Sequence, residues 1–180
     1  YYATISKNPL SRRGENREGI IAASIYLACR KNDCPRTTKE IALIFKLNPK
    51  NVSWGFKNVQ SIINEHENNL FDNEKTELCV TTPQSFIGRF CSKLNINNEL
   101  TNLCLFVSIK IEKENIMPTN TPPSIAAGIV YFISSVCHLN VTKQQVKQIS
   151  EISEVTINKC CKIMEKHKDI LIPESILCKY

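Results

Sequence analysis

An arrangement of small and apolar residues occurs twice along this chain of 180 residues, and it limits the fold more than any other feature. The residues IAAS at positions 21–24 recur as IAAG at positions 125–128, an offset of 104. Parallel registers of this kind are typical of a duplicated supersecondary unit. Further pairs keep an offset of 105: Thr37 and Thr142, Ile41 and Val146, Ile44 and Ile149, Leu47 and Ile152, Val52 and Ile157, Phe56 and Cys161, and Val59 and Met164.

Within each copy the apolar residues have the spacing of α-helices. Ile20, Ala23 and Leu27 follow the three- and four-residue steps of a buried helical stripe. Thr37 and Glu40 have the spacing of a capping box, which marks a helix start. No stretch alternates with period two over the length of a strand, so we predict an all-α fold. The expected helices cover about residues 20–28, 38–45, 49–63, 83–94, 97–115, 124–136, 142–149 and 155–167.

A polar, acidic segment without sustained periodicity separates the two copies and is predicted to be a linker, residues 64–82. We expect a first unit with its linker in residues 1–76 and a second unit in residues 77–180. The net charge of +6 is uneven: residues 1–60 carry +7, residues 61–77 carry −4 and residues 78–180 carry +3. A basic first third is a candidate phosphate-facing surface, although a solvated basic face without a partner has the same composition.

The chain lacks the patterns of several other functional classes. Its nine cysteines do not have the paired spacing of a zinc site, so we expect reduced, buried thiols, no metal and no cofactor. The three histidines are scattered, and no phosphate-binding GxxxxGK motif occurs. No apolar run reaches the roughly 18 residues of a membrane span. The sequence therefore predicts a protein that is not an enzyme and does not act in a membrane.

Several motifs in series identify a family. GIIAASIYLACRKNDCPRTTKE at 19–40, FIGRFCSKL at 86–94, PPSIAAGIVY at 122–131 and SEVTINKCCKIM at 153–164 resemble the cyclin repeats of transcription factor IIB, in the same order. The resemblance implies two tandem cyclin-like five-helix repeats, the first incomplete at its N-terminus. It also implies a general transcription initiation factor whose partners are promoter DNA, the TATA-binding protein and RNA polymerase.

The end of the second unit is a candidate DNA-reading motif. Residues 142–149 and 155–167, with the turn between them, have the spacing of a helix-turn-helix, although such a motif also serves as a packing unit. In the family, the second helix reads an element upstream of the TATA box. Val155 and Thr156 match the family's residues, whereas Asn158 replaces an arginine and can pair with adenine. The candidate DNA-binding residues here are Val155, Thr156, Asn158 and Lys159.

The equivalent motif of the first unit carries Lys46, Lys50 and Lys57. In the family, basic residues near these positions face DNA phosphate and the TATA-binding protein. Trp54 replaces a basic residue, and it is either a partner-facing anchor or a partly buried core residue.

A third candidate is the segment SRRGENR, residues 11–17, which resembles the family's loop that enters the minor groove beside the TATA box. Arg12, Arg13, Gly14 and Arg17 are the expected DNA-binding residues, because narrow minor grooves attract arginine and glycine permits close backbone approach. A flexible solvated loop is the alternative.

The main competing function is that of a true cyclin, a kinase-regulatory binding protein with the same fold. The lysine–glutamate pair expected for kinase contact is not found, and the related factor that serves RNA polymerase III is a nearer alternative. Seventeen lysines against six arginines are typical of an AT-rich genome, and a large DNA virus fits that bias. We expect action in the nucleus, or in a cytoplasmic replication site of the host if the source is viral.

Overall fold

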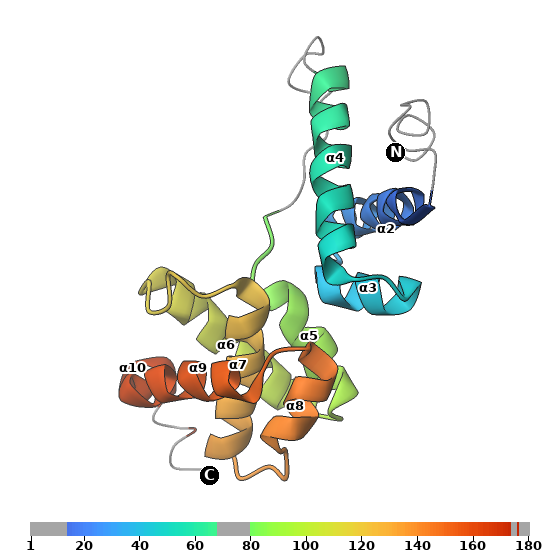
Figure 1. Ribbon diagram of the computed structural model, residues 1–180. Helices are drawn as coiled ribbons and strands as arrows, with labels where there is room; N and C mark the ends of the chain where they lie inside the picture. The colour runs from blue at the N-terminus through green and yellow to red at the C-terminus, as the bar shows by residue number, and fades with distance from the viewer. Residues whose placement is uncertain (1–13, 68–79, 174–175, 177–180) are drawn as a thin grey trace. The chain divides into compact units, whose positions relative to one another are not determined.

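The structure of the protein is a computed structural model, which describes residues 14–67, 80–173 and 176. These residues form helices joined by short turns, and no strand occurs among them. The chain divides into two compact units, Tyr1–Val80 and Thr81–Tyr180 (Figure 1). The prediction of an all-α fold is confirmed.

Three helices make up the described part of the first unit: α2 (Gly14–Lys31), α3 (Thr38–Phe45) and α4 (Pro49–Glu67). The helices α2 and α4 cross in contact with each other, and α3 contacts both (Figure 1). Two small clusters form the core, one built around Ile20, Leu27 and Val59 and the other around Ile41 and Val52. Gly55 lets α4 approach the backbone of α2 at Gly19, where a Cβ atom at position 55 would lie 2.6 Å from the Gly19 carbonyl carbon.

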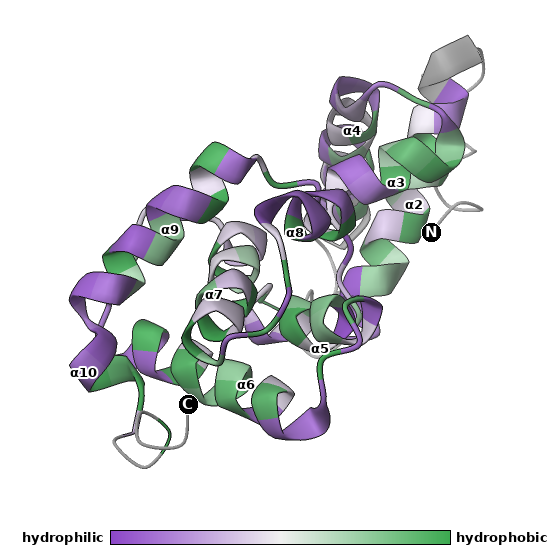
Figure 2. Cartoon of the chain, turned by 90° about the horizontal axis from the view of Figure 1, so that it is seen from below, coloured by the Kyte–Doolittle hydropathy of each residue, from purple (hydrophilic) through white to green (hydrophobic). Residues whose placement is uncertain are grey.

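The second unit is built around one central helix, α7 (Pro122–Val136), which contacts four neighbours. Most of its residues are buried, because its sequence is apolar or small on nearly every side. Its neighbours are α5 (Gln84–Lys93), α6 (Asn98–Lys113), α8 (Lys143–Ser150) and α9 (Glu154–Lys166), and the short α10 (Lys168–Leu171) follows. Figure 2 shows α7 in the middle of this group.

The duplication is visible in the local geometry of the two units. Thr37 and Thr142 each cap a helix of eight residues with a complete capping box, closed by Glu40 in one unit and Gln145 in the other. The helices that they cap, α3 and α8, each end at a residue with left-handed backbone, Lys46 and Glu151, again 105 positions apart. The set α2–α3–α4 therefore corresponds to α7–α8–α9.

The structure differs from the sequence prediction at α4 and α10, and also at the start of α2. The expected linker overlaps a helix, because α4 continues to Glu67. The short helix α10 was not predicted, since four residues are too few to show a helical period. No helix among the described residues has the length and apolar character that crossing a membrane requires.

Candidate nucleic-acid interface

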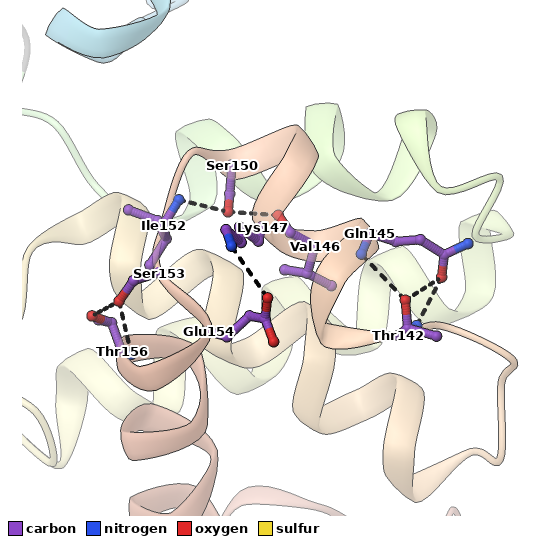
Figure 3. A network of polar contacts seen from close by, with 9 residues as sticks. All are labelled: Thr142, Gln145, Val146, Lys147, Ser150, Ile152, Ser153, Glu154 and Thr156. Atoms are coloured by element: carbon purple, nitrogen blue, oxygen red, sulfur yellow. Dashed lines mark hydrogen bonds and ion pairs between the residues drawn. The ribbon is translucent and has the colours of Figure 1, made fainter.

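The turn between α8 and α9 is held by hydrogen bonds within a few residues (Figure 3). Glu151 takes the left-handed conformation that ends α8, and its backbone N–H donates to the Lys147 carbonyl at 2.9 Å. The Ser150 hydroxyl is buried, donates to the Val146 carbonyl at 2.6 Å and accepts from the Ile152 N–H at 3.2 Å. The direction in which α9 leaves the turn is therefore set by local bonds.

Two further polar contacts fix the start of α9. The Ser153 hydroxyl accepts from the Thr156 N–H at 3.2 Å and lies 2.8 Å from the Thr156 hydroxyl (Figure 3). Across the turn, the Lys147 ammonium lies 3.3 Å from the Glu154 carboxylate. Both side chains are about half exposed, so this pair contributes little stability but neutralises two charges at the tip of the motif.

One side of α9 packs against α7. Ile157, Cys160, Cys161 and Met164 are buried there. The helices approach closely at Gly128, where a Cβ atom would lie 2.5 Å from the Cys160 Cβ. Burial raises the pKa of the Cys160 thiol, and burial together with the Glu165 carboxylate raises the pKa of Cys161 to about 12. These thiols are therefore neutral packing groups.

The opposite side of α9 carries a stripe that is exposed except for the partly buried Asn158, with an apolar and an amide side chain at its start and basic side chains further along. Figure 2 shows the hydrophilic and hydrophobic bands that alternate along this helix. Val155 is 65% exposed, and neither it nor Asn158 makes a polar contact within the described part of the chain. We call the following set the α9 stripe: Val155, Asn158, Lys159, Lys162 and Lys166.

Two members of the α9 stripe, Lys162 and Lys166, were missed by sequence reasoning. The signal that could have found them is their spacing, because they lie three and seven residues after Lys159 and thus on the same face. Thr156, in contrast, was predicted to contact DNA, and the structure places its hydroxyl against Ser153.

The first unit presents the same motif in the same register. Asn48 directly precedes α4, and its side-chain oxygen accepts from the Lys50 N–H at 2.9 Å. Lys50 and Lys57 are exposed, and Trp54 is 41% exposed on the same face. We call Lys50, Trp54 and Lys57 the α4 stripe; with the offset of 105 they coincide with Val155, Lys159 and Lys162 of the α9 stripe.

Lys46 and its neighbours on α3 extend this surface. Lys46 is exposed in the left-handed turn between α3 and α4. Leu43 and Ile44 are 70% and 71% exposed, an apolar pair that the sequence alone did not indicate. The counterpart of Ile44 is Ile149, which is partly buried because α8 packs in a unit that contains α5. No counterpart of α5 exists among the described residues of the first unit.

The predicted minor-groove loop is only partly within the described residues. Arg12 and Arg13 lie outside them. Gly14 and Arg17 lie in the first turn of α2, so the prediction of a loop is wrong from Gly14 onward. The residues that follow Gly14 include glutamate and arginine, which favour helix, and the helix therefore begins earlier than the apolar pattern indicates.

The cysteines and histidines of the described residues do not assemble a metal site. Within the described ranges, no three side chains of the types that ligate metals are grouped so as to hold an ion. Cys104 is buried beside Cys91, and the hydrogen bond that its thiol donates to Cys91, together with burial, raises the pKa of the Cys104 thiol.

Comparison with known proteins identifies similar sequences. The model for the family described as "Transcription factor TFIIB repeat" matches residues 4–62 and 76–167. A transcription initiation factor IIB-like protein of Acanthamoeba polyphaga mimivirus is 33% identical over 162 residues, 90% of this chain and 35% of that protein. Transcription initiation factor IIB of Encephalitozoon cuniculi is 28% identical over 168 residues, 93% of this chain and 50% of its own length.

A third similar protein comes from Thermoplasma volcanium. Transcription initiation factor IIB 2 of Thermoplasma volcanium is 30% identical over 174 residues, 97% of this chain and 51% of its own length. The chain thus spans between about a third and a half of the length of these relatives. The matches extend over both units of the chain.

Proposed function

Because the chain belongs to the transcription factor TFIIB repeat family, we propose that it acts as a general transcription initiation factor that binds promoter DNA and the TATA-binding protein and helps to recruit RNA polymerase. Family membership carries the coarse assignment to transcription initiation. The contacts with DNA and with the TATA-binding protein are inferred from the surfaces described above, and the contact with RNA polymerase from the family.

The observation that carries the DNA-binding proposal is the pair of register-matched stripes. In each unit a short capped helix, a left-handed turn residue and a longer helix present one exposed face. A helix-turn-helix can place the first residues of its second helix against base edges, with neighbouring groups on the phosphates. The α9 stripe has this order, since Val155 and Asn158 come first and the three lysines follow.

The α4 stripe supports contact with phosphate and with a protein. Lysines on an exposed face attract DNA by releasing condensed counterions, without regard to sequence. Trp54 lies between two of these lysines and is 41% exposed, and exposed tryptophan is enriched at the energetic centres of protein interfaces. This combination favours a joint surface for DNA phosphate and the TATA-binding protein.

The other partner and the location follow from the family. The relatives are named transcription initiation factors, which favours this function over a kinase-regulatory cyclin. Recruitment of RNA polymerase and action where transcription begins are therefore part of the proposal. That location is the nucleus, or a cytoplasmic replication site of the host if the source is a virus similar to the mimivirus that encodes the first relative.

The proposal is tested by electrophoretic mobility shift with TATA-containing duplex DNA, with and without the TATA-binding protein. Reversing Lys50 and Lys57 to glutamate should weaken binding to all sequences and reduce the salt dependence of the affinity. The matched control reverses Lys93 and Lys113, two exposed lysines outside both motifs, and should change binding much less.

Three results would count against the proposal. If wild-type protein formed no complex with the DNA in the presence of the TATA-binding protein, the adaptor function would be refuted. If the stripe variant and the control variant lost affinity equally, binding would depend on net charge and not on the α4 stripe. If the TATA-binding protein did not increase affinity, the joint surface would be wrong.

A further inference from the structure

The end of α2 carries two cysteines on a single backbone motif. Asp33 has left-handed backbone, with φ 52°, and the Cys34 N–H donates to the Cys29 carbonyl at 3.0 Å. Because α2 ends at Lys31, this bond joins the second residue after the helix cap to the third residue before it, which defines the Schellman motif. The side chains of those two residues commonly pack together, so the motif gathers two thiols at one turn.

Four other helices of the described residues end in the same motif, with an apolar side chain where α2 has Cys34. The donors of the corresponding bonds are Leu47, Ile96, Ile116 and Leu139. Each follows a residue with left-handed backbone and packs against a core cluster. Cys34 instead is exposed, which differs from the buried thiols expected from the sequence. Packing explains the side chains at the four other helix ends but not the thiol at the end of α2.

The backbone geometry fits a disulfide between the two residues. A disulfide joins residues whose Cα atoms lie about 4.4–6.8 Å apart. The 3.0 Å backbone bond keeps the Cα atoms of Cys29 and Cys34 within about 7 Å of each other, since each lies at most two covalent bonds from a bonded atom. Arg36 fixes the same turn, because its guanidinium donates to the Cys34 carbonyl at 3.0 Å. Both cysteines are reduced in the structure, and the more exposed Cys34 is the first that a reagent meets.

We propose that Cys29 and Cys34 form a redox-active dithiol site that reacts with hydroperoxides and closes into a disulfide across the end of α2. The Cys34 thiolate attacks one peroxide oxygen and the O–O bond breaks, so that Cys34 becomes a sulfenic acid and the other oxygen leaves as water or alcohol. The Cys29 thiolate then attacks the Cys34 sulfur, the S–O bond breaks and the second oxygen leaves as water. The two thiols lose two electrons and two protons, and the peroxide takes up both.

A disulfide at this turn stabilises the first unit. The cross-linked segment leads through Pro35 directly to Thr37, which caps α3. The bond restricts the unfolded chain more than the folded one, whose backbone the motif already holds in place. Oxidation should therefore raise the Tm of the first unit by about 5 °C or more, followed by the fluorescence of Trp54.

The test maps the disulfide in the folded chain after treatment with hydrogen peroxide. Trypsin cleaves after Arg30 and Lys31, which lie between the two cysteines. Peptides 18–30 and 32–36 therefore stay together only through a bond between Cys29 and Cys34. The remaining thiols are alkylated before digestion, so that no disulfide forms during it. Peroxide should produce the linked pair of peptides in most molecules, and a dithiol reductant should separate it.

The matched variants copy the second unit, which has Ser134 and Leu139 where the first unit has Cys29 and Cys34. Cys34→Leu should give no linked pair of peptides and no rise in Tm after oxidation. Cys29→Ser should leave Cys34 as a sulfenic acid, which dimedone labels, because no second thiol attacks it. Circular dichroism should show unchanged helicity in both variants, since the same motif already holds each replacement residue in the second unit.

The inference fails if peroxide converts Cys34 to sulfinic or sulfonic acid without a linked pair of peptides, because the two thiols then do not meet. It also fails if the linked peptides come from covalent dimers on a non-reducing gel, or if Cys34→Leu shows the same rise in Tm as wild type. None of these results bears on DNA binding, which the mobility shift measures with reduced protein. The dithiol site and the proposed function can therefore fail separately.

Discussion

Replacing Gly55 by alanine should destabilise the first unit, because α2 and α4 meet there backbone to backbone. An added Cβ would lie 2.6 Å from the carbonyl carbon of Gly19 and closer still to its oxygen, whereas ordinary contacts are 3.4–4 Å. The obstacle is backbone on a packed helix, so no change of rotamer relieves it. One helix has to move by about an ångström, and the contacts of Ile20 and Val59 in the core move with it.

The expected magnitude follows from two opposing effects. Overpacking of this kind costs about 3 kcal/mol at the upper end of its usual range. Alanine in place of glycine inside a helix contributes about 1 kcal/mol in the other direction. The net loss of about 2 kcal/mol corresponds to a decrease in Tm of roughly 8–16 °C for a unit of this size.

The assay uses Trp54, which is the one tryptophan of the chain and lies next to Gly55. Its fluorescence during thermal or urea unfolding follows the first unit. The matched control is Gly88→Ala in α5, where an added Cβ meets no atom within 4 Å. That variant should be stabilised by up to about 1 kcal/mol, measured by circular dichroism because Gly88 lies in the second unit and Trp54 follows the first. If Gly55→Ala were as stable as wild type, or gained stability as Gly88→Ala does, the close approach of α2 and α4 would be refuted.

Three further predictions concern local contacts. Thr142→Ala removes the side chain that caps α8, and it should cost about 1 kcal/mol in unfolding by urea; a variant as stable as wild type would contradict the capping box. Trp54→Ala should weaken assembly with the TATA-binding protein on DNA by tenfold or more in a mobility shift, with unchanged helicity; equal affinity would exclude an anchor role. Burial raises the pKa of the Cys161 thiol in the folded state to about 12, whereas the unfolded thiol ionises at its ordinary pKa of 9.0. The stability that Cys161 contributes should therefore be fully present below pH 9 and be lost as the pH rises through about 12. Urea unfolding of wild type and Cys161→Ala over this pH range measures the difference, and parallel curves for the two proteins would contradict it.

The sequence was sufficient to predict those features that depend on neighbours in the chain. Thr37 and Glu40 form the expected capping box because its three-residue spacing is a local property. Ile157 and Met164 are buried as their helical period indicates. The face that carries Val155 and Lys159 follows from the same period, since the remaining residues of the helix must face outward.

Features that depend on the geometry between helices could not be predicted from the sequence. The Lys147–Glu154 contact requires the turn at Glu151 to be left-handed, and glutamate gives little sign of that conformation in a sequence. The approach of Gly55 to Gly19 depends on the crossing of two helices that are far apart in the chain. The exposure of Ile44 shows the same limit, because its counterpart Ile149 is partly buried in a unit that contains α5, and the described residues of the first unit hold no counterpart of α5.

The matched register of the two stripes has a consequence for how this chain diversified and how it can be redesigned. Duplication supplied two copies of one scaffold, and the outward positions then changed independently: lysine, tryptophan and lysine at 50, 54 and 57, against valine, lysine and lysine at 155, 159 and 162. These side chains project from the scaffold, while separate residues maintain its packing. Exchanging these outward residues between the two units should therefore exchange their binding preferences as well. Affinity for phosphate, protein or base would then depend on a few surface positions and not on the unit that carries them.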